Sequence, residues 1–243
     1  MDSRERGLQL GDVFACRPLV AALRDAGEDW AATPLQERCG PVRALSTHRR
    51  VERGAQTVAP YGHGLDALIA QSAVFAQSRE LPGPTGESNT VSFDAHGLLA
   101  LLCREGMDAE LLLEAAVAAL LAGNTVLFLT DAPTRGVVMR LRETLSDAGF
   151  PDAASAQQLF GDAAGMALAL GELDIDGAIC CADPALAELA SRALAAREGA
   201  ILPLIDEEPG PYFLARFGHE KTVSVNTTAA GGNAALMSQT EGD

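Results

Sequence analysis

The residues of this chain that could do chemistry are its cysteines and histidines. The five cysteines are scattered without a CxxC pair, and the four histidines lack the HxxxH spacing of a metal-binding helix. Cys180 and Cys181 are candidate nucleophiles, but a reactive thiol needs a positively charged, partly exposed setting. These two lie in an apolar run between Asp176 and Asp183. The pattern therefore predicts buried structural thiols and no metal site.

The carboxylates near the expected strand ends fit structural roles better than catalytic ones. Asp183 precedes Pro184, and this pair predicts a helix start at which the Asp side chain accepts from free backbone N–H groups. A phosphate bound at that helix end would meet a negative charge and donors already in use. Glu87 is expected to stabilise a turn rather than to act as a general base. The acidic run at 206–208 is expected to form a solvated turn.

The composition excludes several classes of function. The chain of 243 residues has 33 acidic and 18 basic side chains and a net charge of −15, which opposes binding to nucleic acid or to an anionic membrane. No apolar run reaches the roughly 18 residues that a membrane-spanning helix needs. The N-terminus lacks the apolar region of a signal peptide. Together with the unpaired cysteines, these features indicate a reducing, cytoplasmic compartment.

The elements that would position these residues alternate between strands and helices. Apolar runs without alternation predict buried strands at 98–103, 125–129, 178–181 and 201–205. Helices are expected between the caps Asp108 and Gly123, and over about 134–147 and 184–198. Such an alternation predicts an α/β fold with an open, mostly parallel Rossmann-like sheet flanked by helices. Before it, short helices are expected at 19–26 and 65–77, separated by an irregular stretch.

A β-strand flap, or arm, is expected outside this sheet, near residues 81–93 and 222–226. Residues 90–93 alternate, and so do Thr222, Val223 and Val225 with smaller polar residues, which is typical of strands. The two strands would pair and tie the middle of the chain to its end. A rigid, non-helical connector is expected before the first strand, with the support residues Pro82, Gly83, Pro84, Gly86, Glu87 and Asn89.

The stretch that follows the second strand carries almost no side chain. Small residues let another backbone come close, and paired glycines permit positive φ angles. Residues 222–237 are therefore expected to be a docking element, which would add to a sheet edge by main-chain hydrogen bonds. A flexible Gly/Ala tail is the alternative. The expected interaction residues are Thr222, Val223, Val225, Asn226, Thr227, Thr228, Gly231, Gly232, Asn233 and Met237.

Three motifs carry a resemblance to known families. LPGPTGESNT at 81–90 and VNTTAAGGNAALM at 225–237 resemble two signatures of proline utilization A (PutA), the bifunctional enzymes of proline catabolism, in the family's order. LLAGNTV at 120–126 resembles the turn that feeds the second strand of the nucleotide-binding domain in the aldehyde dehydrogenase superfamily. The resemblance implies a C-terminal, aldehyde-dehydrogenase-like domain of PutA at 81–237. A helical and irregular lead-in would precede it at 1–80, and a disordered tail would follow at 238–243.

The resemblance also implies that groups needed for catalysis are missing. The superfamily's ribose-binding Lys falls at Leu129, which cannot donate a hydrogen bond. The loop at 104–108 replaces the loop that carries the oxyanion Asn, and 181–184 replaces a glycine-rich pyrophosphate loop. No segment matches the motifs around the nucleophilic Cys or the Glu base. No catalytic, cofactor-binding or metal-binding residue is therefore expected on this chain, whereas PutA proteins hold FAD and NAD on their catalytic modules.

By resemblance, the chain is expected to be a non-catalytic domain that docks on and covers the glutamate-semialdehyde dehydrogenase module of PutA. It would support substrate channelling or oligomerisation, with PutA catalytic modules or a second copy as partners. Two other functions fit the sequence: an NAD-dependent aldehyde dehydrogenase or a fragment of one, and a small nucleotide-binding module. A free-standing protein, a split subunit and an internally deleted PutA are all compatible with the sequence.

Overall fold

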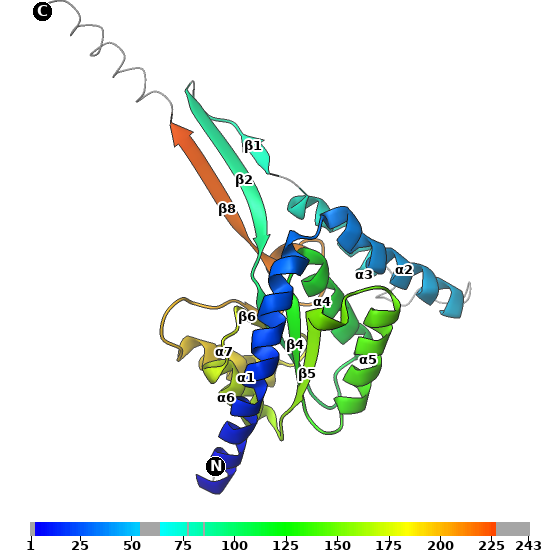
Figure 1. The fold of residues 1–243 in the computed structure, drawn as a ribbon, viewed down its shortest axis with the longest axis vertical. Helices are drawn as coiled ribbons and strands as arrows, with labels where there is room; N and C mark the ends of the chain where they lie inside the picture. Colours follow the sequence, from blue (N-terminus) through cyan, green and yellow to red (C-terminus); the bar gives the residue numbers. More distant parts are fainter. Residues whose placement is uncertain (1–2, 54–63, 77, 85, 227–243) are drawn as a thin grey trace, which may run out of the picture.

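A five-stranded parallel sheet lies between two layers of helices, and a three-stranded antiparallel arm projects from it (Figure 1). The computed structural model describes residues 3–53, 64–76, 78–84 and 86–226. The strands of the parallel sheet are β3 (Leu98–Cys103), β4 (Thr125–Thr130), β5 (Ser155–Leu159), β6 (Gly177–Ile179) and β7 (Leu204–Ile205). The helices are α1 (Ser3–Ala32), α2 (Leu35–Arg53), α3 (Gly64–Gln71), α4 (Ala109–Ala122), α5 (Arg135–Asp147), α6 (Ala163–Glu172) and α7 (Pro184–Ala195).

The parallel sheet has the strand order β5-β4-β3-β6-β7. The first strand, β3, is therefore central. The next two strands, β4 and β5, lie on one side of it, and β6 and β7 lie on the other side. All residues of β3 and β4 are buried, as expected for strands covered on both faces. This topology confirms the prediction of an open, Rossmann-like α/β sheet.

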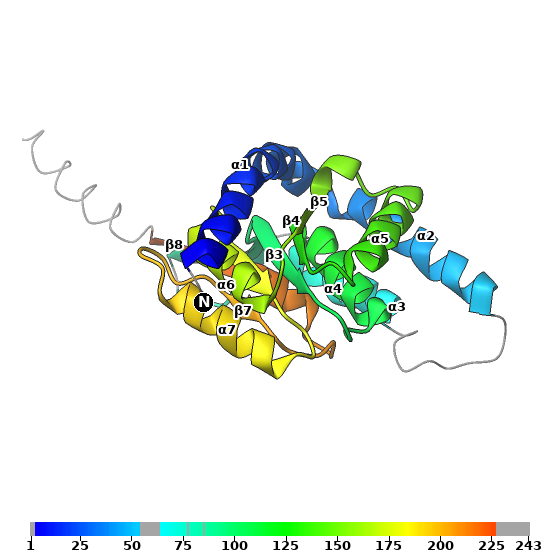
Figure 2. The ribbon, with the colours of Figure 1, turned by 90° about the horizontal axis from the view of Figure 1, so that it is seen from below.

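Each face of the sheet packs against its own set of helices (Figure 2). Leu99, Leu101 and Phe128 share one core with α2, α3, α4 and α5. Leu98 and Leu129, on the opposite face, share the other core with α1, α6 and α7. The alternation of side chains along each strand separates the two cores.

The central helix α4 begins and ends where its capping residues predict. The Asp108 side chain accepts a hydrogen bond from the backbone N–H of Glu110 at 2.9 Å. Gly123 adopts the left-handed conformation with φ 103°, which closes the last turn. From Leu111 to Ala122 every residue is buried, because the sheet and the neighbouring helices surround α4.

The lead-in is more helical than predicted. Instead of a short helix over 19–26, α1 extends from Ser3 to Ala32, with Pro18 and Gly27 inside it, and the stretch predicted to be irregular forms α2. Cys16, Val20 and Leu23 of α1 are buried against the sheet. Burial of this apolar stripe outweighs the helix-breaking signals, since tertiary packing supplies most of the stability of such helices.

The second half of the sheet also departs from the prediction. The strand expected over 201–205 is only β7, and Ile201 is 98% exposed. The strand expected over 178–181 ends at Ile179. Neither β5 nor α6 was predicted, because β5 is a polar edge strand and α6 is a short helix rich in Ala and Gly.

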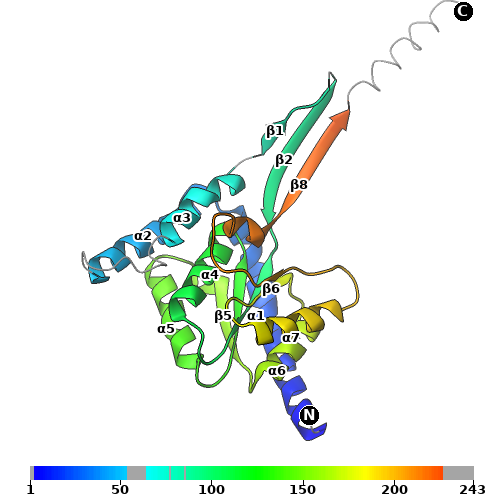
Figure 3. The same ribbon diagram turned by 180° about the vertical axis from the view of Figure 1, so that it is seen from behind.

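The arm consists of β1 (Arg79–Leu81), β2 (Glu87–Ala95) and β8 (Gly218–Asn226), in the order β1-β2-β8. Val223 lies opposite Thr90 and Val225 opposite Ser88, so the predicted pairing of the two distant strands is confirmed. The short strand β1 on the other side of β2 was not expected. Figure 3 shows the arm extending away from the helices, with β8 along one edge.

Near the arm's base, Phe93 of β2 packs edge-on against Phe75, with ring centroids 5.9 Å apart. Phe75 belongs to the 3₁₀ turn Ser72–Phe75 that follows α3. Gln71, at the end of α3, accepts from the N–H of Leu214 at 2.9 Å and donates to the carbonyl of Gly210 at 3.0 Å. The arm is thus connected to α3 and to the loop that leads into β8.

None of the helices in the described part of the chain has the length and apolar character needed to cross a membrane.

A buried carboxyl group lies between α3 and α4. Glu114 is 5% exposed, and burial together with the nearby Glu110 raises its pKa to about 7. A Cβ atom on Gly64 would meet the carboxyl group of Glu114, so the start of α3 packs closely against this side chain.

Replacing Glu114 should change how stability depends on pH. The folded chain keeps a proton that the unfolded chain releases between pH 4.5 and about 7, so Glu114 lowers stability as pH rises through this window. Glu114→Gln should therefore stabilise the chain at pH 8, by up to about 3 kcal/mol, and have little effect at pH 4. Denaturant unfolding at both pH values measures the difference in the free energy of unfolding between the variant and the unchanged chain. Glu143→Gln, an exposed change on α5, is the control, and an equal effect of Glu114→Gln at both pH values would contradict the assignment.

Candidate functional site

Two places in the fold are candidates for function: the crevice at the carboxyl ends of the parallel strands, and the arm. In open α/β sheets ligands bind where the strand order reverses, and here the order reverses between β3 and β6. The loops that surround this point are 104–108 after β3, 131–134 after β4 and 180–183 after β6.

An ion pair within the chain spans the crevice. Arg104 Nε, from the loop after β3, pairs with the carboxylate of Asp183 at the start of α7. The other carboxylate oxygen of Asp183 accepts from the N–H of Leu186 at 3.0 Å. The predicted cap of α7 is therefore confirmed, and the helix end that would bind a phosphate already holds a negative charge.

A second carboxylate occupies the neighbouring loop. Asp131 accepts hydrogen bonds from the N–H of Glu105 at 2.8 Å and from the N–H of Thr134 at 2.9 Å. Burial alone would raise the pKa of Asp131, but these hydrogen bonds and the charge of Arg104 outweigh it and hold the pKa below its ordinary value. Asp131 is thus an anion close to the start of α5, and the loops after β4 and β6 each hold a carboxylate that accepts from a helix N–H group.

The remaining crevice residues named from the sequence are buried. Leu129 is fully buried in β4 and belongs to the core shared with α1, α6 and α7. Burial raises the pKa of Cys180 to about 12, and the negative charge of Asp183 contributes to this rise. Burial likewise raises the pKa of Cys181 to about 12, and Asp206 contributes. All five cysteines are buried, and none forms a disulfide. The described residues contain no group of three or more His, Cys, Asp or Glu side chains that could hold a metal ion.

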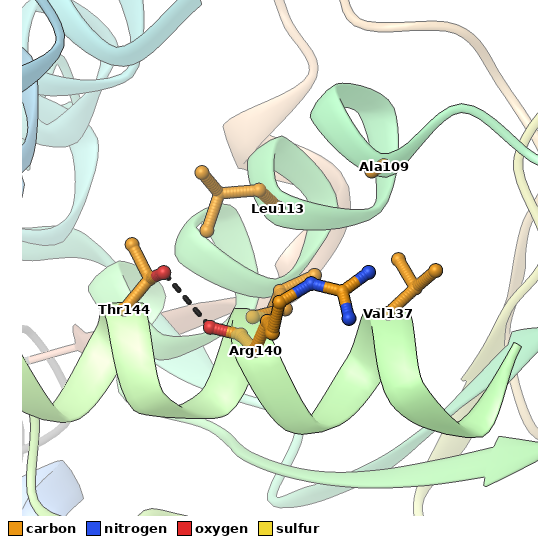
Figure 4. Close-up of a pocket in the computed structure, with 6 residues that line it drawn as sticks. Ala109, Leu113, Val137, Arg140 and Thr144 are labelled. Carbon is orange, nitrogen blue, oxygen red and sulfur yellow. Dashed lines mark hydrogen bonds between the residues drawn. The ribbon is translucent and has the colours of Figure 1, made fainter. Parts of the chain in front are cut away.

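A groove between α4 and α5 lies outside this crevice (Figure 4). Its volume is about 220 Å³, and its lining residues are Ala109, Leu113, Val137, Arg140, Leu141 and Thr144. The hydroxyl of Thr144 donates to the carbonyl of Arg140 at 2.8 Å, so it is already used within α5. The groove therefore offers an apolar surface and one cation, without a nucleophile or a base.

The arm contains only part of the predicted docking element. Thr222, Val223, Val225 and Asn226 belong to β8, where they are exposed. The predicted interaction residues Thr227, Thr228, Gly231, Gly232, Asn233 and Met237 lie outside the described residues.

The predicted support residues form the turn that leads into β2. The N–H of Glu87 donates to the carbonyl of Pro84 at 3.0 Å, and Gly86 has φ 92°. A Cβ atom on Gly83 would lie 2.5 Å from the amide nitrogen of Asn89, so the connector and the strand are in close contact. Pro82 lies between β1 and this turn. The turn-stabilising role of the Glu87 side chain stays a prediction, since the bond to Pro84 comes from the backbone.

At the base of the arm, one buried amide connects three elements. Asn124 is fully buried and accepts from the N–H of Gly97 at 2.9 Å. Its amide nitrogen donates to the carbonyls of Ala119 at 3.0 Å and Phe217 at 2.8 Å. The end of α4, the start of β3 and the start of β8 are therefore joined by one side chain. The Ala-Gly-Asn turn signalled this residue, but its role in holding the arm was not predicted.

Arg38 of α2 lies close to Gly123, the residue before Asn124, and two of its guanidinium nitrogens have no partner among the described residues. It is 6% exposed, and neither Nε nor Nη1 has a hydrogen-bond partner among the described residues. Burial lowers the pKa of its guanidinium group. Nη1 is close to Gly123, at the carboxyl end of α4, whose helix dipole offsets part of the charge.

Replacing Arg38 with an apolar residue of similar length should stabilise the chain. A buried charge without a full set of partners lowers stability by several kcal/mol. Replacing such a group by a well-packed apolar side chain often raises the free energy of unfolding. Arg38→Met is expected to raise the free energy of unfolding by about 1–3 kcal/mol, measured by denaturant titration. Arg43→Met, on the exposed side of α2, should change it by less than about 0.5 kcal/mol. A loss of stability in Arg38→Met would mean that the guanidinium group is well paired.

The chain is similar to PutA proteins in sequence and in structure. It is 35% identical to the bifunctional protein PutA of Salmonella typhimurium over 178 residues, which are 71% of this chain and 12% of that protein. It superposes on a crystal structure of a Bradyrhizobium japonicum PutA mutant with a TM-score of 0.67 at 25% identity, covering 83% of this chain and 24% of the other. The chain thus spans only about one eighth of the length of the PutA relatives it matches, at 12%.

A further relative is a dehydrogenase outside PutA. The chain is 27% identical to N-succinylglutamate 5-semialdehyde dehydrogenase of Sphingopyxis alaskensis over 202 residues, which are 76% of this chain and 42% of the relative. No protein-family model matches the chain.

Proposed function

Because this chain is homologous to PutA proteins and has the fold of their aldehyde-dehydrogenase-like domains, we propose that it is a cytoplasmic, non-catalytic domain of a proline-catabolism system. It docks through its arm on a glutamate-semialdehyde dehydrogenase module of the PutA type. There it covers the module and supports substrate channelling or oligomerisation.

The observation that carries this proposal is that, among the described residues, β8 pairs with β2 and with no strand on its other side. An edge strand presents unpaired N–H and C=O groups, which another strand can pair with. Val223 and Val225 are 44% and 50% exposed on the same face of this strand, next to Thr90 and Ser88 of β2. Proteins usually protect exposed strand edges with charges, and β8 carries Glu220 and Lys221 near its start, whereas its valines lie further along the strand and favour a partner there.

The contents of the crevice support the absence of a cofactor. Asp183 and Asp131 place negative charge at the loops where a dinucleotide would present its phosphates. Leu129 is fully buried, and its side chain has no hydrogen-bond donor for a ribose.

The arm proposal predicts a specific effect of charge on β8. Val223→Lys with Val225→Lys should weaken binding to a purified PutA dehydrogenase module at least about tenfold, or about 1.4 kcal/mol, because two desolvated apolar contacts are lost. Biolayer interferometry measures the affinity, and a coupled assay measures leakage of the semialdehyde intermediate.

The matched control is Ser224→Lys, which places a charge on the opposite face of the same strand. If the double variant binds as tightly as the unchanged chain, the arm is not the docking element. Sedimentation of the chain alone distinguishes pairing with a second copy from pairing with the module.

An active dehydrogenase is the second candidate function. The parallel sheet with its open strand ends, together with the 27% identity to a semialdehyde dehydrogenase, favours it. Under our proposal, calorimetric titration with NAD gives no binding below about 1 mM, a threshold set by the affinity scale of weak ligands. Micromolar binding accompanied by aldehyde turnover would favour the dehydrogenase, and a nucleotide retained through purification would favour a nucleotide-binding module.

A further inference from the structure

Two histidines lie where the long strands of the arm join the body. His96 follows the end of β2 and precedes Gly97 and β3. His219 is the second residue of β8 and lies opposite Asp94. Their ring centroids are 5.8 Å apart and the ring planes are inclined by 32°. The sequence separates these residues widely, and only the pairing of β2 with β8 brings them together.

The ring of His96 is fixed to the body. Its Nε2 lies 3.1 Å from the carbonyl oxygen of Arg216, so in the neutral ring Nε2–H donates to this carbonyl. Burial lowers the pKa of His96, and the charges of His219 and Arg216 lower it further, whereas the Arg216 hydrogen bond and Asp176 raise it. His96 is therefore neutral at pH 7, and it is half-buried between the arm and the body.

The charged groups around the pair are already engaged. Asp176 faces His96 from the loop before β6, but it accepts from Arg24 at 3.1 Å and from the N–H of Leu98 at 2.7 Å. Arg216 faces His96 from the turn before β8 and pairs with Glu207 at 3.3 Å. On the arm itself, Lys221 and Asp94 form a pair at 3.8 Å. Imidazole is the type of side chain that ordinarily gains a proton in mildly acidic solution, and two imidazoles meet at this point of the arm.

We propose that the His96–His219 pair is a proton-sensitive hinge, which holds the root of the arm at neutral pH and loosens it in mild acid. Protonation of both rings places two cations 5.8 Å apart next to Arg216, and they repel each other. His219 is exposed and belongs to the edge strand, so it can move outward. The movement breaks the first pairs of the ladder, at His219 with Asp94 and Gly218 with Ala95, while Asn124 still holds the carbonyl of Phe217.

Hydrogen–deuterium exchange of the full chain at pH 7.5 and pH 5.5 tests this hinge. After correction for intrinsic exchange rates, protection of 88–96 and 218–226 should fall about tenfold more than that of 98–103 and 109–122, the factor that corresponds to one pKa unit of coupling. In His219→Gln the arm should keep its protection at pH 5.5. His48→Gln, on α2, is the matched control and should behave like the unchanged chain.

A second measurement keeps the hinge testable even if a variant alters the arm. In the unchanged chain, NMR titration of the imidazole C–H signals gives the pKa of His96, which should rise in His219→Gln because a repelling neighbour is removed. Arm protection that does not change with pH, or an identical loss in His219→Gln, would overturn the proposal. So would an unchanged pKa of His96 in this variant. The hinge concerns the attachment of the arm and holds or fails independently of which partner the arm binds.

Discussion

The arrangement of this fold depends on the side-chain amide of Asn124. It is fully buried, and it accepts one hydrogen bond and donates two, to three separate elements. Burying an amide without hydrogen-bond partners costs more free energy than a single hydrogen bond contributes to stability. The three hydrogen bonds of Asn124 are therefore expected to form together. The end of α4, the start of β3 and the start of β8 are fixed together by this unit, and with them the direction in which the arm leaves the body (Figure 1).

The position of this amide separates the two candidate sites. Gly97 and Phe217 lie at the amino end of β3, whereas Arg104 and Asp183 lie at its carboxyl end. The strand between them has six residues and spans about 20 Å. The arm can therefore keep its geometry whatever happens to the crevice. The arm therefore presents its edge strand at the opposite end of the sheet from the crevice.

The sequence was sufficient to predict elements whose ends or pairing are set by a strong local pattern. Asp108 and Gly123 delimited α4 because both caps are set by local hydrogen bonding and by positive φ. The pairing of β2 with β8 followed from alternation and from the family motifs. The extent of α1 was not predictable, since Pro18 and Gly27 suggest helix ends and only burial of Val20 and Leu23 overrides them. The contacts of Arg104 with Asp183 and of His96 with His219 depend on crossovers between distant strands, which no local pattern contains.

The crevice also explains how such a sheet can be stable without a ligand. The amino ends of α5 and α7 present N–H groups that need an acceptor, and in nucleotide-binding relatives of this fold a phosphate can supply it. Here Asp131 and Asp183 supply it from within the chain, and Arg104 balances the charge of Asp183. An internal carboxylate satisfies these donors permanently, whereas a ligand does so only when it is bound. A phosphate at either helix end would compete with the carboxylate that already accepts there. This arrangement fits the non-catalytic role that we propose for the chain.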